Sequence, residues 1–275
     1  DNLKLHPDKR FHLRSQLFPS YVTSNFGIGI YGKYSVDGEV TATPNEFHLD
    51  VRQDLAFIIG YNFRIWDGRI KFGFNGRYIN RTEIKDQDPI VPVATTGLKL
   101  TDYADEGGAM AADIGLIITM PWAWLPTIAG VVRDAGGTKF TFAKGILHGG
   151  AADINDPAYP TAQVPKPVSQ TIDAAFAVFP VSKGRTRMTV TGEYTDVTNV
   201  NLELDSAKKI HAGLEFNFSD MFFLRGGWNQ RYWTAGVELA YADMQFQLAS
   251  YGEEIGTVTL NREDRRYSMK FAYRF

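Results

Sequence analysis

The stretch RRYSMKFAYRF (Arg265–Phe275) alternates strictly between two kinds of side chain. One parity is apolar and mostly aromatic: Tyr267, Met269, Phe271, Tyr273 and Phe275. The other parity is basic or small: Arg266, Ser268, Lys270, Ala272 and Arg274. Because successive side chains of a strand point to opposite faces of its sheet, this stretch predicts a strand with one apolar and one polar face.

The same alternation recurs along most of the chain. It is clearest in KIHAGLEFNF (209–218), YWTAGVELAY (232–241) and IKFGFNGRY (70–78), and twelve such segments follow one another between Phe26 and Phe275. Segments of this length with turns between them are typical of transmembrane barrels, whose sheet closes because lipid offers the backbone no hydrogen bonds. The sequence therefore predicts an all-β fold, an up-and-down antiparallel β-barrel of the bacterial outer membrane.

A soluble β-sandwich or a lipocalin-like barrel has the same alternation and is the alternative interpretation. Aromatic residues at the ends of the apolar faces favour the membrane, because such residues form girdles at membrane interfaces. They are Tyr78, Tyr194, Trp228, Trp233, Tyr241 and Phe275.

The connections between the expected strands alternate in length. Short ones lie at 66–68, 121–126, 182–185, 219–220 and 242–243, and long ones at 36–46, 82–110, 144–169, 196–207 and 252–264. The link near Gln230 is the exception, being short where a long one is expected. Outer-membrane barrels have short periplasmic turns and long external loops, so we expect the C-terminus on the periplasmic side.

The N-terminal region, residues 1–25, is expected to be a strand or a plug, and residues 26–275 a single barrel domain. Phe11, Leu13 and Leu17 alternate with polar residues, which favours a strand that pairs with the one beginning at Phe26. Since closed single-chain bacterial barrels have even strand numbers, this reading predicts fourteen strands in the full-length protein. The alternative is a twelve-stranded barrel in which residues 26–34 pair directly with residues 267–275.

One apolar stretch is nearly as long as a membrane-spanning helix. IGLIITMPWAWLPTIAGVV (Ile114–Val132) contains no charged residue. Pro121 and Pro126 interrupt it, and proline in a helix interior removes hydrogen bonds and introduces clashes. Two strands joined by a turn at PWAWLP are therefore expected.

Composition excludes several classes of function. The 275 residues carry a net charge of -2 and contain no cysteine, so nucleic-acid binding, disulfides and thiolate metal sites are not expected. His211 and Glu215 share a parity, but no serine in a nucleophile context accompanies them, and we expect no enzyme activity, cofactor or metal. The acidic stretches at 83–89 and 152–157 have oxygen ligands suited to calcium, but such stretches are more often solvated loops.

Charged residues of both signs fall on the parity expected to face the lumen. Positive and negative charges mixed at this density favour a salt-bridge network that fills a narrow barrel. The second interpretation is a lining that selects solutes. The lumen-facing candidates are Lys71, Arg77, Asp113, Asp173, Glu193, Lys209, His211, Glu215, Arg225, Glu238 and Lys270, with Arg274 on the same parity.

The segment AADIGLIITMPWAWLPTIAGVVRDAGGTKF (111–140) resembles the strand–turn–strand module of the FadL-like outer-membrane superfamily, especially its PorV and TraF-like branches. Matching residues are Asp113, Gly115, Gly130, Arg133, Gly136 and Gly137, with Asp134 where asparagine is usual. The resemblance covers roughly residues 105–275 and implies a monomeric fourteen-stranded barrel, sometimes plugged. The family's Asn-Pro-Ala segment near the N-terminus is absent.

The C-terminal residues Phe271, Tyr273 and Phe275 resemble the signal read by the barrel-assembly machinery, with Lys270 where glycine is usual. The expected surroundings are a lipid bilayer and lipopolysaccharide. The resemblance implies passive transport of small or hydrophobic molecules; the alternative is a PorV-like structural barrel that holds a secretion or surface protein. A hydrophobic ligand or a protein partner would meet the long loops.

Overall fold

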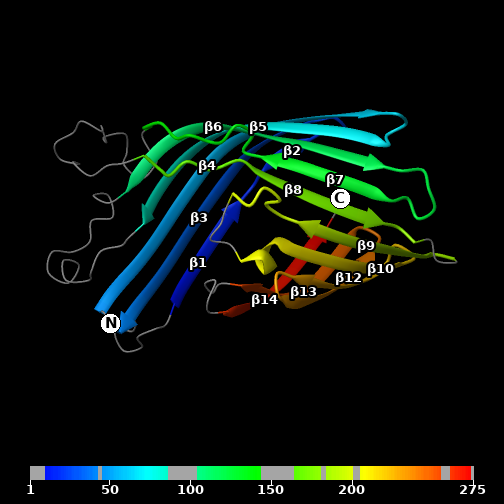
Figure 1. The fold of residues 1–275 in the computed structure, drawn as a ribbon. Coiled ribbons are helices and arrows are strands. Elements are labelled where there is room, and N and C mark those ends of the chain that lie inside the picture. The colour runs from blue at the N-terminus through cyan, green and yellow to red at the C-terminus, as the bar shows by residue number, and fades with distance from the viewer. Residues whose placement is uncertain are drawn as a thin grey trace. The chain divides into compact units, whose positions relative to one another are not determined.

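The computed structural model describes residues 10–42, 45–85, 104–143, 164–180, 184–200, 205–254 and 261–273 (Figure 1). These residues form β-strands and one short 3-10 helix, η2 (Ser206–Lys209). The strands are β1 (Arg10–Leu17), β2 (Ser20–Val22), β3 (Phe26–Ala42), β4 (Asn45–Ile65), β5 (Ile70–Lys85), β6 (Asp105–Thr119), β7 (Thr127–Arg133), β8 (Thr171–Val178), β9 (Thr186–Tyr194), β10 (Ile210–Phe218), β11 (Phe222–Asn229), β12 (Tyr232–Tyr241), β13 (Met244–Glu254) and β14 (Glu263–Tyr273).

All strands belong to one antiparallel, up-and-down sheet of fourteen strands. Its order follows the chain, from β1 through β3 to β14, with β2 also pairing with β3. The all-β prediction is confirmed, and the twelve strands expected after Phe26 are β3 to β14. Within the described residues no pairing joins β1 to β14, so the sheet is not closed there.

The first strand is interrupted at a proline. β1 and β2 pair with β3 in one continuous register, from Arg10↔Glu39 to Val22↔Gly27. Pro19 breaks the strand because proline has no N–H for the ladder, although its carbonyl still accepts from the Ile30 N–H at 3.1 Å. The predicted pairing is thus present. The twelve-stranded alternative is wrong, because β3 already has partners on both sides.

The apolar stretch 114–132 forms the predicted hairpin. β6 and β7 pair from Ile114↔Val132 to Thr119↔Thr127, and the Met120 N–H donates to the Pro126 carbonyl at 2.8 Å. The turn takes positive φ angles at Trp124 and Leu125. Among the residues that the structure describes, no helix is long and apolar enough to cross a membrane.

Several expected loops are strands instead. The ladder of β3 and β4 continues to Ala42↔Asn45, so the long connection expected at 36–46 is wrong. β5 likewise runs to Lys85, β6 begins at Asp105, and β13 and β14 pair out to Glu254↔Glu263. Polar and glycine residues resemble loops in a sequence, but they stay in a strand where the neighbouring strand satisfies their backbone groups. Most of the expected loop at 144–169 lies outside the described residues.

The chain divides into two compact units, of which unit 1 comprises 1–62, 74–113 and 134–169. Here the inner segment, which we define as 134–143 with 164–169, packs against the strands. Thr138 and Val168 form one isolated bridge, and Gly108 and Thr141 another. Phe140 joins a buried cluster with Ile79, Ala56, Ala109 and Ala111. The guanidinium of Arg81 lies 4.7 Å from the centroid of the Phe140 ring.

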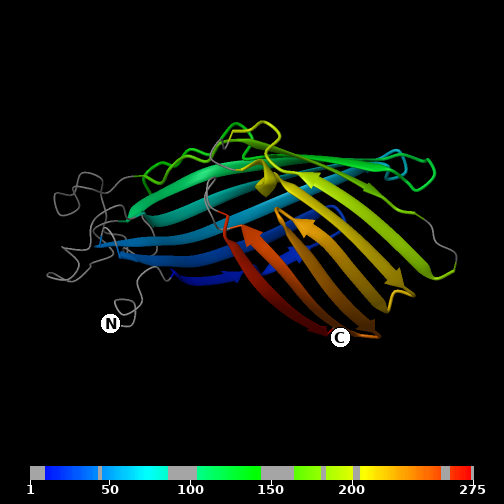
Figure 2. The same cartoon turned by 60° about the horizontal axis from the view of Figure 1, so that its bottom comes forward.

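Unit 2 comprises 63–73, 114–133 and 170–275, and its two faces differ as the alternation predicts. In Figure 2 the strands β10 to β14, coloured yellow to red, lie side by side. Register pairs place Leu224, Val237, Leu248 and Met269 in one row across four of them, and all four are exposed. The opposite face carries polar side chains, among them Glu238, which is 4% exposed. We call these the apolar and the polar face of unit 2.

A close contact between β8 and β9 tests this register. Gly192 pairs with Phe176, and a Cβ at Gly192 would lie 2.3 Å from the Phe176 ring. We expect Gly192→Ala to cost about 1–3 kcal/mol of unfolding free energy, because overpacking displaces the ring. The measurement is denaturant unfolding followed by tryptophan fluorescence.

The matched control is Gly226→Ala, because a Cβ there meets no heavy atom within 4 Å. That change should stay within about 0.5 kcal/mol. In a Phe176→Ala background the cost of Gly192→Ala should fall. Equal costs at Gly192 and Gly226 would contradict the pairing of β8 with β9.

Candidate functional site

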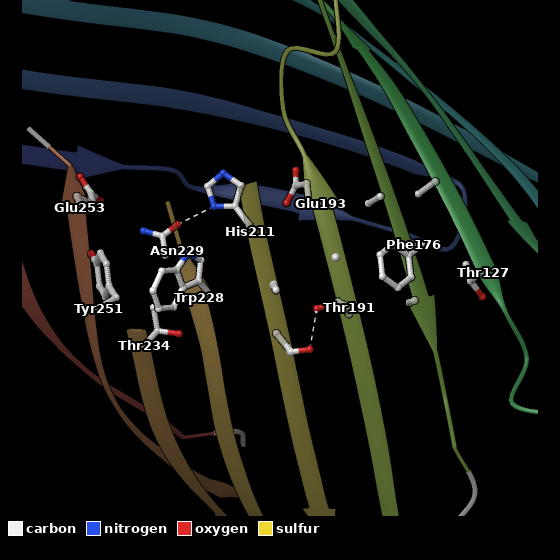
Figure 3. Close-up of a pocket in the computed structure, with 16 residues that line it drawn as sticks. Thr127, Phe176, Thr191, Glu193, His211, Trp228, Asn229, Thr234, Tyr251 and Glu253 are labelled. Atoms are coloured by element: carbon white, nitrogen blue, oxygen red, sulfur yellow. Dashed lines mark hydrogen bonds between the residues drawn. The ribbon is translucent and has the colours of Figure 1, made fainter. Parts of the chain in front are cut away.

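The polar face of unit 2 is hollowed at its centre. Register places two rows of residues side by side there, Ala175–Glu193–His211–Asn229 and Ala177–Thr191–Gly213–Gly227–Thr234. Most of these side chains are small, and a cavity of about 720 Å³ lies over them. We call it the central hollow; Figure 3 shows the side chains that line it.

Glycine is required at the floor of the hollow. A Cβ at Gly213 would lie 2.8 Å from the Thr191 hydroxyl, and one at Gly227 would lie 2.9 Å from the Thr234 hydroxyl. The two glycines pair with each other, so the hydroxyls of Thr191 and Thr234 lie over bare backbone. The local sequence thus makes room for hydroxyl groups in the middle of the sheet.

Polar side chains at one edge of the hollow are held in defined positions. His211 Nδ1 and Asn229 Oδ1 are 2.7 Å apart, and Asn229 Nδ2 donates to the Gly252 carbonyl at 2.8 Å. Because the Asn229 amide nitrogen is used by Gly252, its oxygen accepts from His211 Nδ1. In the neutral ring this leaves Nε2 as an acceptor. Glu193 is the cross-strand neighbour of His211 and is exposed (Figure 3).

A buried charge cluster surrounds Lys209, the last residue of η2, which lies two residues before His211 of β10. Lys209 is 3% exposed, and its Nζ is 3.0 Å from Asp196 Oδ2 and 2.8 Å from Asn199 Oδ1. The Asp196 N–H donates to Asp173 at 2.9 Å, and Asp173 also pairs with Arg133. We call this the Lys209 cluster; its two cations and two carboxylates balance.

A second cluster lies on the other side of the hollow, on β10 to β13. Arg225 Nε donates to Glu215 at 2.6 Å, and its terminal nitrogen is 2.6 Å from Glu238. Gln247 donates to Glu238 at 2.8 Å and Gln245 donates to the same carboxylate. We call this the Arg225 cluster. It holds one more negative than positive charge.

Unit 1 contains a third cluster, beside its inner segment. Arg77 pairs with Asp113 and, at 2.6 Å, with Asp134. The Asp134 N–H donates to Asp113 at 2.8 Å, and Thr138 donates to Asp134 at 2.6 Å. Asp134 has φ 49°, a left-handed conformation that asparagine and aspartate tolerate, which accounts for an Asx residue here.

The remaining candidates do not join these clusters. Lys71, Glu193 and Lys270 are exposed. Phe271 and Tyr273 are exposed on the apolar face at 61% and 59%, and Phe275 and Arg274 lie outside the described residues. Of the expected lumen-facing residues, the structure therefore brings together Arg77 with Asp113, Lys209 with Asp173 through Asp196, and Glu215 with Arg225 and Glu238.

Sequence reasoning missed several partners in these clusters. Asp134, Asp196 and Asn199 follow strands in turns, and each has a positive φ angle. Asp54 and Arg81 form a further buried pair at 2.6 Å in unit 1. The signal that could have found the turn residues is an Asx residue at a strand end: Asp134 comes directly after β7 and Asp196 two residues after β9. Asp54 and Arg81 could have been predicted as a pair because both lie on the polar parity of their strands, β4 and β5.

Charged groups also order the connection between β11 and β12. Arg231 pairs with Asp205, which precedes η2 and accepts from the Ala207 N–H at 3.1 Å. The hydrogen bond from Arg231, followed by that from Ala207, lowers the pKa of Asp205. Tyr232 donates to Glu254 at 2.8 Å, so this end of β12 is tied to β13.

The central hollow presents groups that can form hydrogen bonds with a ligand. Within the described ranges, no group of three or more histidine, aspartate or glutamate side chains is placed to hold a metal ion. The polar groups of the clusters satisfy one another, whereas the central hollow exposes hydroxyl, imidazole and carboxylate groups.

Comparison with protein-family models, curated proteins and solved structures found no match. The resemblance to the FadL-like superfamily therefore stays a hypothesis that depends on the residues quoted for it.

The Lys209 cluster gives a stability prediction. Lys209→Met leaves Asp196 buried without its cation, and breaking a buried pair from one side costs about 3–5 kcal/mol. We expect a loss of this size in the free energy of unfolding, measured by denaturant titration.

Lys270→Met is the matched control, because Lys270 is exposed on β14. Surface changes usually stay within about 0.5 kcal/mol. If Lys209→Met were as mild as Lys270→Met, the ion pair with Asp196 would not be part of the folded protein.

Proposed function

We propose that this protein is an outer-membrane β-barrel of FadL or PorV type that lets small molecules pass the membrane. The observation that carries the proposal is the contrast between the two faces of unit 2. Tyr267 and Met269 are 81% and 73% exposed on the apolar face, while Lys209 and Glu238 are buried on the polar face. In water such an apolar face would promote association; in lipid it is the stable arrangement.

The strand lengths and the aromatic residues support a membrane. β12 has ten residues, and transmembrane strands have about 9–11 at a tilt near 45°. Along β11 and β12, Trp228 and Trp233 lie near one end of the apolar face, and Phe222 and Tyr241 near the other. Two aromatic rows with aliphatic side chains between them match the girdles of outer-membrane barrels.

The number of strands bears on closure. β1 and β2 form one interrupted strand, so the sheet has thirteen strand positions, an odd number. Because closed single-chain bacterial barrels have even strand numbers, the proposal includes one further strand, which gives the fourteen of the FadL-like superfamily. The proposal places the C-terminus in the periplasm and assigns insertion to the barrel-assembly machinery.

The polar face favours passive passage over catalysis. The floor of the central hollow consists of small residues, among them Thr191, Gly213 and Thr234, which leaves room for a solute. The inner segment of unit 1 favours the second candidate, a PorV-like structural barrel, because Phe140 and Pro165 are buried against the strands there. Passage of solute distinguishes these two functions.

The test is osmotic swelling of proteoliposomes. The protein is reconstituted into phospholipid vesicles, and the light scattering that follows addition of urea or erythritol is compared with that of protein-free vesicles. Faster swelling supports transport. If protease protection shows that the protein is inserted but the vesicles do not swell faster, transport is excluded. The structural barrel is then the remaining candidate function.

The membrane part has its own test. Leu214 lies on the apolar parity of β10, opposite Val190 and Gly226. Arginine on the lipid face near mid-membrane costs about 2–4 kcal/mol, so Leu214→Arg should lower unfolding free energy in vesicles by this amount.

The matched change is Thr189→Arg, on the polar face directly opposite Glu215. Its guanidinium would meet a carboxylate and not lipid, so the cost should be clearly smaller. Equal costs, or the reverse order, would mean that the apolar face of unit 2 does not contact lipid.

A further inference from the structure

The chemistry of the central hollow narrows the class of solute. Glu193 has no ion pair or hydrogen bond with any residue in the described part of the chain, and Glu253 at the far edge is paired with Arg266 at 2.6 Å. No lysine or arginine lines the hollow. The lining thus combines apolar side chains, among them Phe176 and Trp228, with hydroxyl and imidazole groups and one carboxylate that is not neutralised from within.

Three classes of ligand fit this lining poorly. A hydrocarbon would desolvate Glu193, His211 and the threonine hydroxyls without replacing their hydrogen bonds, which is costly. An anion would meet a carboxylate and no basic side chain. A small quaternary cation would be attracted by Glu193, but its nitrogen has no N–H group to donate to the hydroxyls of Thr191 and Thr234.

A hydroxylated solute matches the polar groups of the lining. His211 Nε2 and the Glu193 carboxylate are acceptors on neighbouring strands, whose directly opposed side chains have Cβ atoms about 4.5–5.5 Å apart. Adjacent hydroxyl groups of one ligand can donate to both. The same hydroxyls can accept from Thr234, because each hydroxyl is both donor and acceptor. The Thr191 hydroxyl donates to the Gly213 carbonyl at 3.4 Å, and its oxygen can accept from the ligand.

We propose that the central hollow is a binding site for a small neutral polyol of the sugar type. Its volume of about 720 Å³ is within the usual range of small-molecule sites, about 300–1,000 Å³. This inference rests on the proposed function, since the solute would reach the hollow on its way across the membrane. It differs from passage of hydrophobic molecules, which the resemblance to the FadL-like superfamily implies.

The experiment is equilibrium binding to the protein in lipid nanodiscs, with maltose, choline and laurate as probes. Saturation-transfer difference NMR gives the affinity of each. Maltose should bind saturably, and Ala175→Leu, which fills the hollow, should weaken it by at least about tenfold through overpacking. Ala174→Leu, the neighbour on the opposite face of β8, should change it by less than about twofold.

Two further variants separate fit from folding and charge. Thr234→Val removes one hydroxyl at constant shape and should weaken maltose binding even if Ala175→Leu does not fold. Glu193→Gln keeps an acceptor oxygen and should leave maltose binding within about threefold. If choline binds in place of maltose and Glu193→Gln abolishes that binding, the site is a cation site and the proposal is wrong.

The binding assay tests the proposed site, and the swelling assay tests the proposed transport function, so either proposal can fail without the other. Maltose binding without solute-driven swelling would overturn the transport function and leave the site. Swelling with no saturable maltose binding, or with equal binding in the Ala175→Leu and Ala174→Leu variants, would overturn the site and leave transport. If laurate binds and maltose does not, the ligand is hydrophobic and the proposed polyol site is wrong.

Discussion

A shift of one residue in any strand pairing would exchange the two faces of this sheet, and that constraint governs everything else in it. Side chains alternate with a period of two, so one register buries Lys209 and Glu238 beside their partners, and the next would turn Glu238 to the apolar side. A charge moved there would lose its counter-ion. The ion-pair clusters and the exposed apolar rows thus specify the same register from opposite faces.

Alternation explains why so much of the fold could be predicted from sequence. Strands such as 232–241 carry the pattern in every residue, and even the interrupted first strand keeps its parity through Pro19. Strand ends were harder to predict. Residues 36–42 contain glycine and acidic residues that are typical of loops, yet they remain paired with β4. Whether a polar segment stays in a sheet depends on its neighbour, and a single sequence does not contain that information locally.

The candidate site was only partly visible for a related reason. The acidic and basic residues on the polar parity could be named, because parity is a local property. The partners in turns, such as Asp196 and Asn199, depend on a positive φ angle that aspartate and asparagine permit but do not require. The central hollow depends on small residues from several strands meeting in register, and Gly213 and Gly227 have no special meaning until they are paired.

The distribution of charge along β10 gives the hollow its character. Lys209 and Glu215 lie on either side of His211 and Gly213 on the same face, and each belongs to a cluster that satisfies it. Two neutralised or nearly neutralised clusters fix the strands without creating a strong field between them, because opposite charges a few ångströms apart cancel at longer range. The residues of β10 between the two clusters therefore do not have to hold the strands together by ion pairs. The hollow can carry hydroxyls, an imidazole and one carboxylate, groups that bind through short-range hydrogen bonds. A sheet stabilised by paired charges on both sides of the hollow, with hydrogen-bonding groups and the single unpaired carboxylate of Glu193 in between, fits the proposed binding of neutral polar solutes.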